Sequence, residues 1–197
     1  NTYIEPQIDA TFTDIKQFDD LLDNSHLHLK IDRSKVTLSD IAPLVPQLYK
    51  FDSPISIKCD IEGKLNNFTA HSINIDMANK AIALDMEAAI QNIQSLKELN
   101  ITKSNIHLYT KNHGPQLIRQ NIEVSDTTLL NILSNAAAVD FNSNISGSLS
   151  NLKTRISLSS GIGDFATNLT LSGDSTLSRL SCNGYIESKG VDFVKIL

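Results

Sequence analysis

Hydrophobic and polar residues alternate one for one along much of this chain. From Ile55 to Glu62 every odd-numbered position is apolar and every even-numbered position is polar. A period of two places successive side chains on opposite faces of a β-strand, so this run predicts a strand with one dry face. The same alternation predicts strands at residues 27–31, 36–38, 73–77, 82–86, 106–108, 156–158, 169–171 and 191–193. Because these runs alternate instead of being apolar throughout, we expect a largely antiparallel sheet.

Two segments break this alternation and predict short helices. Residues 39–49 begin at a capping serine and carry apolar side chains at helical spacing. Pro43 and Pro46 restrict that helix to a turn or two, because proline lacks the amide hydrogen that a helix interior needs. Residues 125–133 also begin at a capping residue, Ser125, and run into an alanine-rich stretch that favours helix. The chain is therefore predicted to be mainly β with one or two short helices.

An internal repeat suggests how these elements are organised. Residues 61–68 align without a gap with residues 145–152, and residues 101–108 align with 186–193 at almost the same offset. Gly63 and Gly147 occupy the same place in the first pair, where a strand gives way to a turn and a positive φ is useful. We expect N-terminal strands and a short helix over 1–50, a first β repeat over 51–124, and a short helix with a second β repeat over 125–197. The predicted architecture is an elongated, curled sheet that forms a trough, cut from a longer array.

Composition and charge exclude several classes of partner. The 197 residues carry a formal net charge of -5 and no cluster of Lys or Arg. Nucleic acids and anionic membrane surfaces are bound through such clusters, so we expect neither electrostatic partner. The longest apolar run, Ala136 to Val139, is far shorter than the roughly 18 residues of a membrane-spanning helix. The absence of Trp makes an aromatic-rich active site less favoured.

No catalytic or metal-binding constellation emerges from the sequence. His26 and His28 share one face of a predicted strand, but no further ligand stands at a metal-binding spacing, so we expect solvated histidines. His71, His107 and His113 are isolated in the sequence, and no serine lies in a nucleophile elbow. We therefore predict no enzyme activity, no metal and no cofactor.

The two cysteines leave a choice between a bridge and separate thiols. Cys59 is in phase with the apolar positions of its strand, which favours a buried thiol, although a disulfide with Cys182 stays possible from the sequence.

The order of these elements resembles a known family. Residues 34–46 lead into residues 53–57 and 61–68, and the second copy ends with residues 185–193. This arrangement is similar to the periplasmic repeat region of the TamB and AsmA-like proteins, particularly those of Bacteroidota. The resemblance implies a non-enzymatic segment of an inner-membrane-anchored protein in the periplasm of a two-membrane bacterium. It further implies phospholipid as cargo, a role in outer-membrane protein assembly and secretion, and a TamA- or BamA-type outer-membrane barrel as partner. Membrane contact would then come from parts of the parent chain outside this segment.

If the resemblance holds, the dry faces of the strands line a lipid-carrying trough. The lining would consist of Ile55, Ile57, Ile61, Ile73, Ile75, Ile82, Leu84, Ile106, Leu108, Ile156, Leu158, Leu169, Leu171 and Phe193. Ordinary packing in the core of a closed sandwich would produce the same pattern. Two other functions therefore stay open: a β-sandwich module that binds carbohydrate or protein on a surface protein, and a purely structural spacer.

Overall fold

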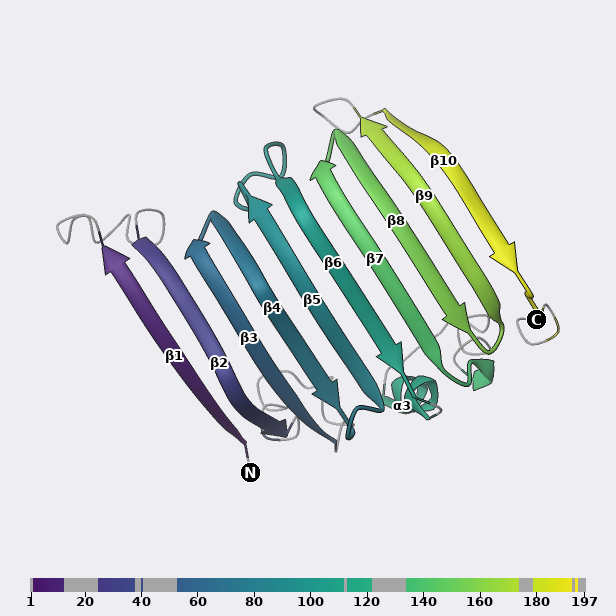
Figure 1. Ribbon diagram of the computed structural model, residues 1–197, viewed down its shortest axis with the longest axis horizontal. Coiled ribbons are helices and arrows are strands. Elements are labelled where there is room, and N and C mark those ends of the chain that lie inside the picture. The colour runs from purple at the N-terminus through teal and green to yellow at the C-terminus, as the bar shows by residue number, and fades with distance from the viewer. Residues whose placement is uncertain are drawn as a thin grey trace.

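One sheet contains every strand of the described chain. The computed structural model describes residues 2–12, 25–37, 40, 53–111, 113–121, 134–173, 179–192 and 194. Ten strands join side by side in the order of the sequence, and each is antiparallel to its neighbours (Figure 1). Their bounds are β1 (Tyr3–Phe12), β2 (Ser25–Thr37), β3 (Pro54–Lys64), β4 (Asn67–Met77), β5 (Ile82–Gln91), β6 (Asn100–Thr110), β7 (Val139–Ser148), β8 (Asn151–Ser160), β9 (Gly163–Gly173) and β10 (Leu180–Lys189). The prediction of a mainly β, antiparallel protein is confirmed.

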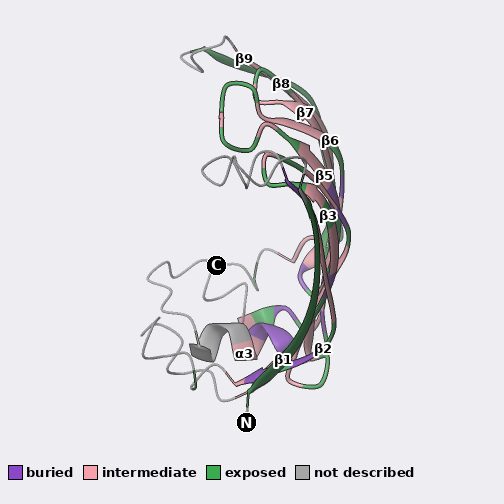
Figure 2. Ribbon diagram, turned by 90° about the vertical axis from the view of Figure 1, so that its left-hand side faces the viewer, coloured by how far each residue is buried: buried purple, intermediate pink, exposed green. Residues whose placement is uncertain are grey.

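The sheet is strongly curved and open. Figure 2 shows the strands following an arc, with the helix α3 (Gly114–Asn121) on the concave side. This helix identifies which face is concave, because it begins against a side chain of that face. A Cβ added to Gly114 would lie 2.5 Å from the Cβ of Thr110, which is paired with Ile82 in β5. The face that carries Ile82 and Thr110 is therefore the concave one, and the predicted curled sheet is confirmed.

No second sheet covers the concave face within the described ranges, since all ten strands belong to one sheet. The alternative of a closed β-sandwich is thus wrong for this part of the chain. The physical reason lies in the connections between strands. Most of the described connections are short hairpin turns, which place each strand beside the previous one instead of crossing to another layer.

The repeat is visible in two hairpins. Gly63 and Gly147 each precede a two-residue turn, between β3 and β4 and between β7 and β8, and both have positive φ (+135° and +109°). The first repeat alignment therefore joins equivalent positions. The second does not, because Ile101 lies at the start of β6 whereas Ile186 lies near the end of β10. The segment boundaries at residues 50 and 124 stay a prediction.

The remaining expectations concern elements that the structure places differently or does not describe. Alternation does not mark β1, β7, β10 or α3, and it predicts a strand at residues 191–193. That strand is wrong for Val191 and Asp192, which follow the end of β10, and Phe193 lies outside the described residues. Of the expected helix over 39–49 only Asp40, in helical conformation, is described. The expected helix over 125–133 lies outside the described residues.

Candidate functional site

The concave face gathers the apolar side chains that the alternation singled out. In an antiparallel pair, residues that stand directly opposite each other point to the same face. Following the register from strand to strand places the expected lining on this one face, with only Phe193 left outside the described residues. The members are Ile55, Ile57, Ile61, Ile73, Ile75, Ile82, Leu84, Ile106, Leu108, Ile156, Leu158, Leu169 and Leu171.

An unbroken line of large apolar side chains crosses the middle of this face. We call it the central row; each member is paired with the next across adjacent strands, from β3 to β9. Its members are Ile57, Ile75, Leu84, Leu108, Phe141, Leu158 and Phe165. Six steps of about 4.8 Å between strands give the row a length of roughly 29 Å. Every member is half-buried, so its neighbours pack its flanks while one side stays open.

Hydroxyl groups end the central row on both sides. Phe165 is paired with Ser188 of β10. On the other side Ser34 of β2 lies against Ile57, donating its hydroxyl to the Ile57 carbonyl at 2.5 Å and accepting from the Ile57 amide at 2.7 Å. The apolar line therefore has a defined length within the sheet.

Sequence reasoning missed two members of the central row. Phe141 of β7 stands between Asp140 and Asn142, whereas Phe165 of β9 stands between Asp164 and Ala166. The alternation is weak around both, because Ser143 follows Phe141 by two positions, and Gly163 and Thr167 flank Phe165 at the same distance. Met86, which pairs with Ile73 and Ile106, also belongs to this face.

The two cysteines are separate thiols. Cys59 is 7% exposed on the concave face and Cys182 is exposed on β10; both are free. The prediction of a buried thiol at residue 59 is confirmed. Burial raises the pKa of the Cys59 thiol, and the nearby Asp60 charge adds to the rise although a hydrogen bond with the Ile31 backbone opposes it. Cys59 therefore acts as a small apolar side chain of the lining.

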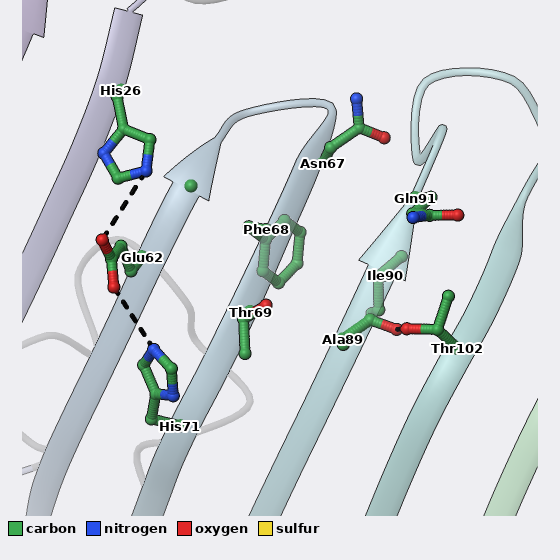
Figure 3. Close-up of a pocket in the computed structure, with 11 residues that line it drawn as sticks. His26, Glu62, Asn67, Phe68, Thr69, His71, Ala89, Ile90, Gln91 and Thr102 are labelled. Atoms are coloured by element: carbon green, nitrogen blue, oxygen red, sulfur yellow. Dashed lines mark hydrogen bonds and ion pairs between the residues drawn. The ribbon is translucent and has the colours of Figure 1, made fainter.

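The convex face is polar and held by pairs of histidines and carboxylates. His28 Nε2 lies 2.9 Å from Asp60 Oδ1. Glu62 stands between two histidines, with His26 Nε2 at 3.6 Å from one oxygen and His71 Nε2 at 3.4 Å from the other (Figure 3). These side chains come from β2, β3 and β4, so the pairs link three strands, and they line a shallow pocket together with Thr69 and Gln91.

The histidine pairs correct part of the sequence interpretation. His71 is isolated in the sequence but not in space, and His107 likewise lies 3.2 Å from Asp140. Sequence distance hid these partners because antiparallel pairing brings them together. Among the residues that the structure describes, no three His, Cys, Asp or Glu side chains are arranged to hold a metal ion. The convex face therefore carries several contacts between histidines and carboxylates that link neighbouring strands.

Neighbouring side chains shift the pKa of one carboxylate on the convex face, that of Glu87. Lys103 Nζ lies 2.8 Å from Glu87 Oε2, and Asn105 donates to the same oxygen at 3.3 Å. These hydrogen bonds, followed by the charge of Lys103, lower the pKa of Glu87. The three residues are on β5 and β6, so this group links the centre of the sheet from its convex side.

Helices contribute little to the described chain, and none of them is both long and apolar enough to span a bilayer. Comparison of the sequence with models of protein families and with curated proteins found no significant match, and comparison with solved structures found none either.

Proposed function

We propose that the concave trough binds the acyl chains of phospholipid without doing chemistry on them. The observation that carries this proposal is the central row: seven large apolar side chains, unbroken from β3 to β9 and each half-buried. A folded protein usually hides such a line beneath a second layer, whereas an exposed apolar surface of this extent indicates a binding site.

The dimensions and energies suit a hydrocarbon tail. Each buried methylene contributes about 0.8 kcal/mol, so a chain of about 16 carbons would gain on the order of 12 kcal/mol if it were fully buried. A tail lying in an open trough keeps one side in water and gains about half of that. The row of roughly 29 Å is long enough for such a tail to lie across the strands.

The family resemblance extends the proposal to the cell envelope. On this proposal the chain is a segment of a TamB- or AsmA-like protein in the periplasm, anchored in the inner membrane through other parts of the parent. Phospholipid would pass along the trough towards the outer membrane, where a TamA- or BamA-type barrel is the proposed partner in protein assembly or secretion. The open, curled sheet supports this proposal because a carrier surface has to be continuous and accessible.

Binding of carbohydrate or protein on a curved sheet is the second candidate. The polar convex face, with its asparagines, serines and histidine pairs, offers hydrogen-bond donors and acceptors to such ligands. Native mass spectrometry of the gently purified chain separates the candidates. Co-purified phospholipid supports lipid binding in the trough, and a saccharide without lipid supports the second candidate. If neither ligand is found, a structural spacer is supported.

Two neighbouring substitutions on β8 test the trough itself. Leu158 lies in the central row, and Ser157 points to the opposite, convex face. Leu158→Asp removes an apolar contact of about 1.5–3 kcal/mol, so binding of a fluorescent fatty acid should weaken roughly tenfold to hundredfold. Ser157→Asp adds the same charge one residue away and should leave the affinity within about twofold. Equal losses in both variants, with circular dichroism unchanged, would argue against binding in the trough.

A further inference from the structure

Exposed apolar side chains of the described chain fall into three places. Those on β1 and β10 lie on the two edge strands, and Val194 lies beyond β10. The remaining three, Leu65, Ile93 and Leu96, lie in two neighbouring connections at one rim in the middle of the sheet. We call them the rim cluster. An edge strand is exposed because no neighbouring strand is present, but that reason does not apply to the rim cluster.

Hydrogen bonds hold the rim cluster in a defined shape. Leu65 is in the turn between β3 and β4, and the other two are in the loop between β5 and β6 (Figure 1). The Ile93 amide donates to the Asn66 carbonyl at 3.2 Å, and the Gln94 amide donates to the Asn66 side chain at 3.1 Å. The loop is closed further by the bond from the Leu99 amide to the Ser95 carbonyl at 2.8 Å. The aliphatic side chains are thus presented outward by an ordered loop, with Leu96 69% exposed.

The rim cluster continues into the trough. Directly below it, Phe68, Ile90 and Ile101 are paired across β4, β5 and β6 on the concave face. An acyl chain can therefore pass from the rim to the lining without crossing a row of charged side chains.

Taking the proposed trough as its basis, we propose that the rim cluster dips into the surface of a phospholipid bilayer and is the place where acyl chains are loaded. The cluster is small and purely aliphatic, without the Trp, Tyr or Arg that anchor protein interfaces, and far below the roughly 800 Å² per partner of a stable complex. Shallow insertion into a bilayer needs only a few such side chains. The charged residues of the turn and loop, Lys97 and Glu98, cancel each other, so this rim lacks the acidity of the chain as a whole.

A single-tryptophan experiment tests insertion without background, because the chain contains no Trp. In the full chain, Leu96→Trp should shift its emission to the blue when phosphatidylcholine vesicles are added, and brominated lipid should quench it. Tyr185→Trp is the matched control, since Tyr185 is 53% exposed but lies on the convex face of the edge strand β10, where its partner Asn168 is in turn paired with Arg155. This control should show neither effect. Equal shifts in both variants would mean unspecific adsorption and would overturn the inference.

A second measurement separates loading from binding. Replacing both Ile93 and Leu96 with Asp should slow transfer of a fluorescent phospholipid from vesicles to the protein by about tenfold or more. The equilibrium affinity for a free fatty acid should stay unchanged in this variant. If the unaltered chain binds fatty acid while Leu96→Trp does not respond to vesicles, the loading site is refuted and the trough stands. If fatty acid does not bind at all, the trough itself is refuted. If the unaltered chain has the mass of a dimer in solution and the Asp variant has the mass of a monomer, the rim cluster is a self-association surface. That result also overturns the inference.

Discussion

The hairpin between β3 and β4 depends on the absence of a side chain at Gly63. A Cβ at this position would lie 2.5 Å from the carbonyl oxygen of Asn67 and 2.7 Å from the Cα of Phe68, and both are backbone atoms that cannot rotate away. The φ of +135° is also one that residues with a side chain rarely adopt. Gly63→Ala therefore strains the backbone by about 1–3 kcal/mol and crowds it by about as much again.

Together these terms predict that Gly63→Ala destabilises the hairpin by about 4 kcal/mol. Amide hydrogen exchange measured by mass spectrometry reports this locally, because local opening sets the exchange rate. Amides of β3 and β4 should exchange roughly 10³-fold faster, at about 1.4 kcal/mol per factor of ten.

Gly190→Ala is the matched control for this effect. Gly190 also has a positive φ, +64°, but nothing lies within 4 Å of an added Cβ. Only the backbone cost of about 1–2 kcal/mol applies there, so exchange of nearby amides should rise about tenfold. If the two variants accelerate exchange equally, or Gly63→Ala has the smaller effect, the close approach of β3 and β4 is not what constrains this glycine.

Two further predictions concern titratable groups. Cys182 should react at once with Ellman's reagent, whereas Cys59 should react only as fast as the sheet opens, because burial covers its sulfur and raises its pKa; equal rates would contradict that burial. The lowered pKa of Glu87 means that its link to Lys103 stabilises the fold above about pH 4.3 and is lost as the pH falls through the folded-state value. Urea titrations should therefore show the stability advantage over Glu87→Gln vanishing in acid, and an advantage that grows in acid would refute the assignment.

Much of the sheet could be predicted because a strand with one buried and one solvated face has apolar and polar residues that alternate along the sequence. The run from Ile55 to Glu62 shows this clearly, and it is most of β3. Edge strands were harder, since β1 contains Pro6 and β10 has Gly184 at an apolar position. The helix α3 has no clear sequence signal, because Gly114 and Pro115 at its start are typical of a turn, although proline is also common in the first turn of a helix.

The sequence predicts which side chains of a strand share the concave face, but not which of them are neighbours across strands. Alternation identifies which side chains share a face within one strand, and the register then decides which of them meet. That register includes irregularities, such as the one between Ala70 and Ile73 opposite β5, that arise from pairing and leave no local signal. The rim cluster was invisible for a similar reason. Leu65 and Leu96 lie in connections, where a leucine has no periodic neighbours to mark it.

The layout of the sheet has a consequence for a loaded protein. Each described strand packs chiefly on the strands before and after it, so β3 and β9 have little direct means of sensing each other. A hydrocarbon tail bound along the central row would contact several strands that do not contact one another. It would therefore link these strands. The empty molecule would then fray strand by strand from its borders, while the filled one would come apart in larger blocks. On the proposed binding, a bound tail would therefore make the strands that it touches unfold together.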